Sequence, residues 1–453
     1  MMCHFFPRTS RAANLCRRIL CLLALPISLT PAYLQASPLD GELSVKAYPS
    51  IQRAIDAHPG RMIYVPAGDY EISEAIRLHT DNAGLFGPGR IIQTRSNAAL
   101  MEIKGAGGVR VRDLTFTRSG GQMETTAPGI TADRCTNLRI EDVQVLDNHS
   151  ASAAIRLSDC RGSQVRHCIV VNYARISVDD RTANTNCGYA FNCIDGTGIA
   201  VFTSVGTLIQ GCRVIENRLF PTHETYEKFA LGKIIKKSRV KGPLLDQQAW
   251  DTEFTRNWYQ GSGILVTSPE TSRYTQILDN YVENAGQGID IHSDQVTLSQ
   301  NMVINAHIGM KAMHGSRNVI ITGNQFSRID LWAIGLMPGT ASHPAVNGNP
   351  ESANEDGGSV IANNVISDFG HGDSHWIWGK DQAPIRFDSG QEADDPPLRD
   401  VVIQGNVVQC AGAPRYRYAV LIAGGGDAPR GLRFSNNVLH PGTAGVANKE
   451  LSP

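Results

Sequence analysis

The chain has 453 residues, of which 42% are hydrophobic, and it carries 42 lysines and arginines against 43 aspartates and glutamates. This length and apolar fraction suit one large soluble domain, or two ordinary ones, with an ample core. The near-zero net charge gives no indication of nucleic acid as a partner.

The first 36 residues have the layout of a secretory signal peptide. Four arginines between positions 8 and 18 precede an apolar run over residues 19–29, and no acidic residue occurs before Asp40. About 11 apolar residues are too few to span a bilayer. We therefore predict a signal peptide over residues 1–36 and a periplasmic or secreted mature protein without membrane contact. Cleavage near residues 30–32 and cleavage near residues 35–36 both fit the small side chains there.

A short helix and a strand are expected at the start of the mature chain. Residues 50–57 have apolar positions at helical spacing, and residues 62–70 follow as an extended segment. A repeating fold must close its end against solvent, and a short helix can do this. We expect the segment over about 44–70 to be such a cap.

Short β-branched segments with an asparagine then recur through the chain. The clean spacings between successive asparagines are 21 and 23 residues, and the longer ones equal this period plus inserted loops. Earlier repeats are expected to hold Asp113, Asp142, Cys168 and Cys212 in the asparagine slot. Stacked side-chain amides can satisfy one another inside a turn, so the pattern predicts a solenoid of parallel sheets. The asparagine repeats are 278–282, 299–303, 322–326, 362–366, 404–408 and 435–439.

The helix at 50–57, the strand at 62–70 and the repeats together resemble right-handed parallel β-helix proteins of the pectate-lyase-like superfamily. This resemblance implies an all-β solenoid that forms one carbohydrate-active domain over residues 37–453. We expect this domain to be a monomer.

The cysteines are expected to be structural. An odd number of them, seven, follows residue 36, which excludes a full set of internal disulfides. Cys187 and Cys193 bracket a short loop and could bond in an oxidising compartment. The others fit small buried positions of the repeats.

Insertions interrupt the repeats at one particular turn. Where this turn carries no insertion it has only four residues, as at 284–287. They cover residues 173–196, 218–261 and 369–383. Loops gathered on one edge of a solenoid can wall a binding groove. The 218–261 insertion is expected to form two helices, 222–237 and 246–258, as a basic and aromatic lid.

Such a lid suits an acidic polysaccharide or oligosaccharide, because aromatic faces stack on sugar rings and cations hold carboxylates. The alternative is a helical hairpin that packs its tryptophans on the solenoid and solvates its lysines. The substrate-binding candidates from the insertions are Trp250, Arg256, Tyr259, His375, Trp376 and Trp378.

One column of outward-facing positions carries the candidate chemistry. Asp290 and Lys311 fall on adjacent repeats, with His292 and His314 on the same patch. Such groups can shift one another's pKa toward acid–base catalysis. The alternative is an ordinary surface ion pair of little energetic value. Further along, Arg386 and Asp388 are expected to bind a neighbouring sugar, with Asp294 as another binding candidate. Aligned repeats place Ala200, Leu265, Asp290, Lys311, Gly335 and Arg386 in this column, and Phe202, Thr267, His292, Met313, Met337 and Asp388 two residues on.

The segment Gly288-Ile289-Asp290-Ile291-His292 also resembles the Gly-Ile-Asp-Pro-His-Asp motif of mannuronan C5-epimerases. The resemblance implies His292 as the base that removes a C5 proton, Asp290 as its orienting partner, and Lys311 with His314 as the groups that neutralise the substrate carboxylate. Ile291 replaces the proline, Ser293 replaces the second aspartate, and His314 stands where the family has arginine. Related β-helix lyases use a lysine or arginine base, which would be Lys311 here, and often Ca²⁺.

We therefore expect an enzyme that abstracts a C5 proton from a uronate-containing polysaccharide, with the lyase outcome slightly favoured over epimerisation. No cofactor is assigned with certainty, Ca²⁺ being the one that the lyase resemblance allows, and no metal ligand is predicted. A glycoside hydrolase is the alternative, and it needs two carboxyl groups about 5–9.5 Å apart, from Asp290 with Asp294 or Asp373. A further alternative is a solenoid that binds polysaccharide without catalysis.

Overall fold

The computed structural model describes residues 43–120, 125–176, 194–219, 261–269, 271–338, 355–374, 381–388, 396–424 and 427–453. Within them, no helix is long and apolar enough to cross a membrane. The 3-10 helix η1 covers Val45–Ala47 and the helix α1 covers Ile51–Ala57. The Ser50 hydroxyl accepts a hydrogen bond from the backbone N–H of Arg53 and so caps α1.

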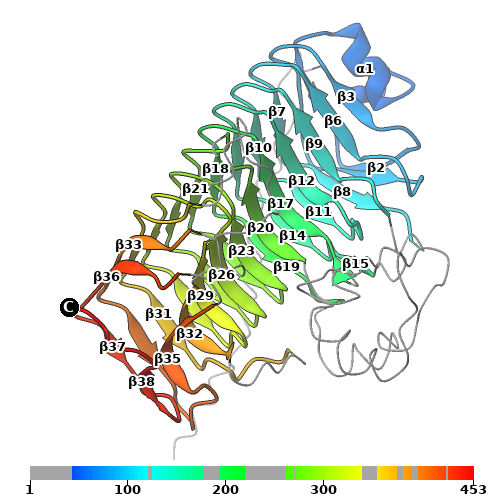
Figure 1. Cartoon of the computed structure of the whole chain (residues 1–453). Helices are drawn as coiled ribbons and strands as arrows, with labels where there is room; N and C mark the ends of the chain where they lie inside the picture. Colours follow the sequence, from blue (N-terminus) through cyan, green and yellow to red (C-terminus); the bar gives the residue numbers. More distant parts are fainter. Residues whose placement is uncertain are drawn as a thin grey trace, which may run out of the picture. The chain divides into compact units, whose positions relative to one another are not determined.

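Helix α1 covers the first edge of the strands, at the blue end of Figure 1. Its inner face buries Ile51, Ala54 and Ile55. The Gln52 amide accepts from the backbone N–H of Arg77 at 2.8 Å and donates to its carbonyl at 3.3 Å. These bonds pair the backbone of the first strand in its sheet, which would otherwise be an open edge.

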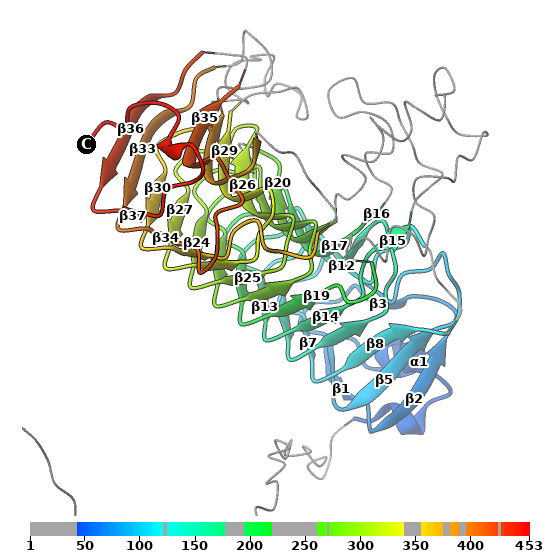
Figure 2. The same cartoon turned by 90° about the horizontal axis from the view of Figure 1, so that it is seen from below.

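Three parallel sheets, each of twelve strands in the described residues, make up the rest (Figures 1 and 2). Each turn of the chain contributes one strand to sheet A, then one to sheet B, then one to sheet C. Sheet A contains β1 (Met62–Tyr64), β4 (Gly84–Phe86), β7 (Arg110–Arg112), β10 (Arg139–Glu141), β13 (Gln164–Arg166), β18 (Leu208–Gln210), β21 (Gln276–Leu278), β24 (Thr297–Ser299), β27 (Ile320–Thr322), β30 (Val360–Ala362), β33 (Arg399–Gln404) and β36 (Arg430–Ser435).

Sheet B contains β2 (Gly68–Ile72), β5 (Gly89–Gln93), β8 (Thr115–Arg118), β11 (Gln144–Leu146), β14 (Ile169–Val171), β19 (Arg213–Ile215), β22 (Tyr281–Glu283), β25 (Met302–Ile304), β28 (Gln325–Ser327), β31 (Val365–Ser367), β34 (Val407–Gln409) and β37 (Val438–Leu439). Sheet C contains β3 (Ile76–Leu78), β6 (Met101–Lys104), β9 (Ile130–Asp133), β12 (Ala153–Ser158), β17 (Thr197–Phe202), β20 (Ser262–Thr267), β23 (Gln287–Ile291), β26 (Ile308–Met313), β29 (Trp332–Met337), β32 (Ala383–Asp388), β35 (Tyr418–Ala423) and β38 (Gly445–Ala447). A separate antiparallel pair joins β15 (Arg175–Ile176) and β16 (Ile194–Asp195).

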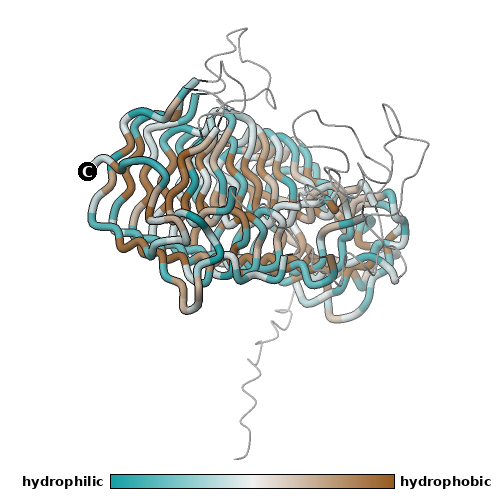
Figure 3. Tube along the Cα trace, turned by 60° about the horizontal axis from the view of Figure 1, so that its bottom comes forward, coloured by the Kyte–Doolittle hydropathy of each residue, from teal (hydrophilic) through white to brown (hydrophobic). Residues whose placement is uncertain are grey.

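The core fills the space between the three sheets. Apolar side chains alternate inward along each strand, and Ile289 and Ile291 of β23 are fully buried there. In Figure 3 hydrophobic residues recur at corresponding places in successive turns. The predicted solenoid of parallel sheets is therefore confirmed.

The turn from sheet A to sheet B has two residues in each repeat from β7 onward, such as 300–301 between β24 and β25. The first residue takes a left-handed conformation, as Gln300 does with φ 58°. The second is the predicted asparagine, and each amide donates to the next, with Asn301 Nδ2 lying 2.9 Å from Asn324 Oδ1. This ladder runs through Asn280, Asn301, Asn324, Asn364, Asn406 and Asn437.

Two members of the predicted asparagine column were placed one position too early. Asp113 and Asp142 hold the left-handed position, with φ of 63° and 55°, and Leu114 and Val143 fill the buried slot after them. Aspartate tolerates this conformation better than most residues, which explains its place here. Cys168 and Cys212 do lie in the column, and the backbone N–H of Cys212 donates to Asn280. Cys135, Cys160 and Cys410 are also buried and form no disulfide, whereas Cys187 and Cys193 lie outside the described residues.

Sheet C is the face at which the long connections begin and end. The predicted insertions all lie between sheet B and sheet C, at 172–196, 216–261 and 368–382. A second set, missed in the sequence, lies at the opposite ends of the same strands, at 268–275, 338–359 and 389–398. The helices expected at 222–237 and 246–258 lie outside the described residues. Inserted segments therefore both precede and follow strands of sheet C along the chain.

Candidate active site

Four polar side chains meet on the outer face of sheet C. Asp290 of β23 pairs in register with Lys311 of β26, as predicted. The Nζ atom of Lys311 lies 3.5 Å from Oδ1 of Asp290, and Nε2 of His292 lies 3.0 Å from the same oxygen. The His314 ring packs edge-on against the His292 ring with centroids 5.0 Å apart. We call these four residues the Asp290 cluster.

The Asp290 cluster is more buried than its outward position predicts. Asp290 is 5% exposed and His314 is 7% exposed, while the side chains of Lys311 and His292 keep 12% and 13%. An ordinary surface ion pair would be far more exposed, so that alternative does not describe this group. Charges act more strongly on one another away from water.

Asp290 is ionised in this setting. Burial by itself raises the pKa of its carboxyl group, but the nearby basic groups of His292, Lys311 and His314 outweigh burial and hold the pKa well below its ordinary range. One negative charge therefore faces three basic side chains, and the site has an excess of basic groups.

This ionisation determines which nitrogen of His292 can act as a base. An ionised carboxylate can only accept hydrogen bonds, so a His292 ring that carries a single proton would hold it on Nε2, beside Asp290. The lone pair is then on Nδ1, which lies 3.4 Å from the Thr267 hydroxyl on the preceding strand. Sequence reasoning placed Thr267 in the right column but gave it no role.

A column of serines fixes the strand ends that carry the two histidines. Ser293 donates from its hydroxyl to the carbonyl of Ser272, and Ser316 donates to the carbonyl of Ile291, next to His292. Asp356 accepts from the backbone N–H groups of Gly315 and Ser316, directly after His314. Ser293, which departs from the epimerase motif, is thus a buried structural residue here.

Arg386 and Asp388 occupy the predicted column positions, but they pair with each other. Nη2 of Arg386 lies 2.7 Å from Oδ2 of Asp388, and both residues are buried. The guanidinium also lies over the Trp332 ring, 4.8 Å from its centroid. This arrangement fits a buried, mutually neutralising pair on sheet C better than a group that is open to a sugar.

The carboxyl groups considered for hydrolysis lie in other settings. Asp294 lies in the turn after β23, where it accepts from Asn318 at 3.0 Å and pairs with Arg317. Asp373 is largely exposed and pairs with Arg328 at 2.7 Å. The register neighbours of Asp290 are Leu265 and Lys311, so neither adjacent strand offers a carboxyl group at its level.

Asp330 anchors one of the inserted segments beside sheet C. Its two oxygens accept from the backbone N–H groups of Gly372 and Ser374 at 2.9 and 3.0 Å. Burial raises the pKa of Asp330 to about 7 despite these bonds. His307 lies nearby, 3.3 Å from the Ser374 hydroxyl, and burial lowers its pKa to about 3.

Several predicted residues lie outside the described residues, and they stay predictions. They are Trp250, Arg256, Tyr259, His375, Trp376 and Trp378. Among the residues that are described, no group of three or more histidine, cysteine, aspartate or glutamate side chains is arranged to hold a metal ion.

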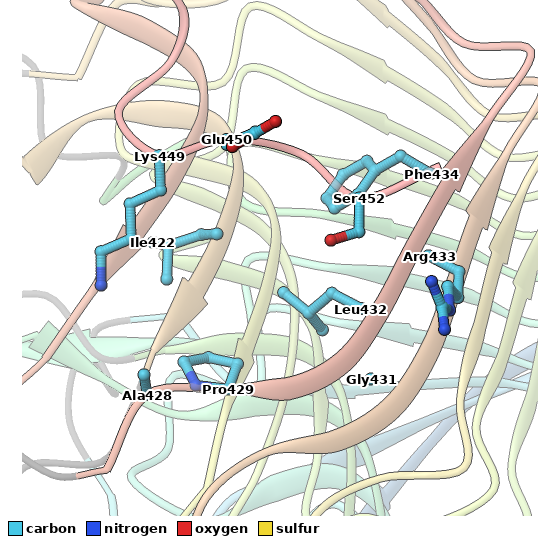
Figure 4. A pocket seen from close by; sticks show the side chains of 10 residues that line it. All are labelled: Ile422, Ala428, Pro429, Gly431, Leu432, Arg433, Phe434, Lys449, Glu450 and Ser452. Carbon is cyan, nitrogen blue, oxygen red and sulfur yellow. The ribbon is translucent and has the colours of Figure 1, made fainter.

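A hollow of about 290 Å³ lies at the C-terminal end, where Leu432, Phe434 and Lys449 contribute to its lining (Figure 4). It is far along the solenoid from the Asp290 cluster, because β23 and β36 belong to turns separated by four others. It contains no histidine. We therefore place the chemistry at sheet C.

Comparison with known proteins identifies the handedness of the fold. A family model described as a right handed beta helix region matches residues 102–326. The chain is a right-handed parallel β-helix. No curated protein sequence matches it.

Solved structures with this β-helix fold include proteins that act on or bind carbohydrates. The A-module of mannuronan C-5 epimerase AlgE6 from Azotobacter vinelandii has a TM-score of 0.54 and 13% identity, with 90% of this chain and 100% of that chain covered. An exopolygalacturonase from Thermotoga maritima has a TM-score of 0.54 and 11% identity, covering 89% and 93%. A tailspike protein mutant of E. coli bacteriophage HK620, in complex with a pentasaccharide, has a TM-score of 0.53 and 12% identity, covering 88% and 62%. At such low identity these likenesses show the fold alone.

Proposed function

We propose that this β-helix protein acts on a uronate-containing polysaccharide by removing the C5 proton of a uronate unit. The observation that carries the proposal is the convergence of Lys311, His292 and His314 on the ionised carboxylate of Asp290. Basic groups in excess attract a sugar carboxylate, and an oriented histidine supplies a base.

Each residue has a chemical task in this reaction. Lys311 and His314 face the substrate carboxylate and stabilise the negative charge that spreads onto it as the C5–H bond breaks. His292 accepts the C5 proton on Nδ1, while Asp290 holds Nε2–H and stabilises the imidazolium that forms. Before substrate binds, the Thr267 hydroxyl lies 3.4 Å from this Nδ1 and orients the ring, and it turns away from Nδ1 when the C5 proton is transferred.

The electron pair left at C5 has two outcomes. In β-elimination it forms the C4–C5 double bond as the C4–O bond breaks, and the departing oxygen leaves with its sugar chain after taking a proton from the His292 imidazolium or from water. In epimerisation C5 takes a proton on its opposite face. We favour elimination slightly, because the proton that His292 takes up can be passed to the leaving oxygen, whereas epimerisation needs a further acid on the opposite face of the sugar.

A glycoside hydrolase is the alternative that the experiment must separate. Hydrolysis has to be tested because the chain has the same fold as an exopolygalacturonase. Against it, the next carboxyl group along the two outward columns of sheet C beyond Asp290 is Asp388, in the column of His292, three strands away, or at least roughly 14 Å at the spacing of adjacent strands. That is beyond the roughly 5–9.5 Å that paired carboxyl groups need.

A screen of uronate polymers with the purified protein tests the proposal. A gain in absorbance from an unsaturated product means elimination, and solvent deuterium at C5 without cleavage means epimerisation. New reducing ends without absorbance mean hydrolysis, and binding without any change means a non-catalytic solenoid. His292→Ala and Lys311→Ala should each abolish turnover, while His79→Ala and Lys104→Ala, at exposed positions, should not. Full activity in both site variants would overturn the assignment.

We also propose that the protein works outside the cytoplasm, as the predicted signal peptide over residues 1–36 suggests. An exported enzyme would meet a polysaccharide that is found outside the cytoplasm. N-terminal sequencing of the protein recovered from the periplasm and from the medium tests this, and an intact Met1 in the cytoplasmic fraction alone would contradict it.

A further inference from the structure

A second hollow lies on the outer face of sheet C, on the N-terminal side of the Asp290 cluster. Its volume is about 440 Å³, and its lining comes mainly from β12, β17 and β20. Leu265 lines it and is also the register neighbour of Asp290. The hollow therefore begins one strand away from the cluster.

The shape of this hollow follows from small side chains on the sheet. Ala153 of β12 and Ala200 of β17 have small side chains that leave space above the sheet. Ser152 and Thr197 add hydroxyl groups to the lining. Arg156 and Phe202 are the large polar and aromatic groups of the lining. A cavity of this size with a few polar groups on an apolar floor is typical of a small-ligand site.

Arg156 has the features of a group that binds an anion. Its guanidinium lies over the Phe202 ring, 4.7 Å from the centroid, and its Nε donates to the Ser158 hydroxyl at 3.2 Å. These contacts orient the side chain, yet in the described part of the chain no carboxylate pairs with it. The contrast is Arg386, which occupies the same column and is neutralised by Asp388.

Register fixes the distance between Arg156 and the reacting groups. Arg156 pairs with Ala200, Ala200 with Leu265 and Leu265 with Asp290. Three strand spacings separate Arg156 from Asp290, which is roughly 14 Å. A sugar bound over Asp290 does not reach that far, so Arg156 would contact another unit of the same polymer.

We infer that the hollow around Arg156 is a binding subsite for a second uronate unit, whose carboxylate pairs with the Arg156 guanidinium. The inference rests on the proposed function and adds the direction in which the polymer is bound. The polymer lies along sheet C from the Asp290 cluster toward β12, with Phe202 and Leu265 beneath its sugar rings. A guanidinium with two N–H edges binds a carboxylate with both oxygens, which suits this task.

Uronate oligosaccharides of graded length test the subsite. In the wild-type protein kcat/KM should rise steeply once the oligosaccharide is long enough to reach Arg156. In Arg156→Ala this rise should shrink about tenfold, as expected for the loss of a charge-assisted hydrogen-bonded pair. Arg156→Lys should restore part of it. Arg139→Ala removes an equal charge from the exposed face of sheet A and serves as the matched control.

The outcomes separate the subsite from the proposed function. If the wild-type protein acts on uronates and Arg156→Ala keeps the full rise with length, the subsite is wrong and the function stands. If the wild-type protein neither binds nor changes any uronate oligosaccharide, the function fails and the subsite with it. Thermal unfolding of each variant shows whether it folds, and should Arg156→Ala be unfolded, Arg156→Gln takes its place in the same comparison.

Discussion

Lys311 and Asp290 are register partners on adjacent parallel strands, and Nζ of Lys311 lies 3.5 Å from Oδ1 of Asp290. Both side chains leave the sheet on its outer face, where each is nearly buried. A pair in this position keeps an ionised carboxylate beside His292 and, under the proposed function, a lysine beside the substrate carboxylate.

Replacing Lys311 by methionine should lower kcat/KM on the true substrate by at least about a hundredfold, since the charge that stabilises the transition state is lost. Lys311→Arg should retain more activity because it keeps that charge. Lys104→Met, at an exposed position of sheet C, is the control. Near wild-type activity in Lys311→Met would remove Lys311 from the mechanism.

Thr267→Val should lower kcat severalfold while leaving the shape of the site intact. The hydroxyl lies 3.4 Å from Nδ1 of His292, and one such hydrogen bond is worth about 1 kcal/mol, or roughly fivefold. Thr267→Ser should recover the activity, because it keeps the hydroxyl. The pH profile of kcat should shift in the valine variant and return in the serine variant. An unchanged profile in both would mean that Thr267 does not position the ring.

Asp330 should make the protein less stable as pH rises. Burial raises its pKa from 3.8 to about 7, so between these values the folded protein holds a proton that the unfolded chain has released. The free energy of unfolding then falls with pH by up to about 1.4 kcal/mol per unit, and the fall ends above the folded pKa. Chemical denaturation across this range should show a weaker slope in Asp330→Asn. If the free energy of unfolding fell equally steeply with pH in the wild-type protein and in Asp330→Asn, the proton would be bound at another residue.

Asn324→Ala should destabilise the whole solenoid. Its amide donates to Asn364 and to the carbonyl of Leu298, and its oxygen accepts from Asn301. Losing these buried bonds and leaving partners unsatisfied should cost about 2–4 kcal/mol. Gln325→Ala, at the exposed next position, should cost less than about 0.5 kcal/mol. Equal midpoints in urea for the two variants would contradict the role of the ladder.

The architecture and the Asp290–Lys311 pairing could be predicted from the sequence because both follow from one period. An asparagine every turn sets the register, and register then places Asp290 beside Lys311 without further information. The errors at Asp113 and Asp142 arose one residue away from this column, where the left-handed position also accepts polar side chains. Period alone does not separate these two neighbouring positions.

Other parts of the site could not be predicted, for physical reasons. Serine is common on surfaces, so the column that includes Ser293 and Ser316 gave no distinct signal until its hydrogen bonds were seen. Pairing between Arg386 and Asp388 depends on side-chain direction, which column position does not determine. Arg156 lay one turn before the aligned column began, and extending the alignment by that turn would have found it.

The two-residue turn between sheets A and B leaves changes in chain length to the other connections. Inserted segments begin and end only around sheet C, so they can lengthen, shorten or be exchanged while the strand spacing stays the same. Transplanting a connection from another solenoid should therefore alter which polymer is admitted without moving Asp290 relative to Lys311. Under the proposed function, polymer recognition and the reaction at Asp290 are then separately adjustable, which makes the scaffold suitable for engineered specificity.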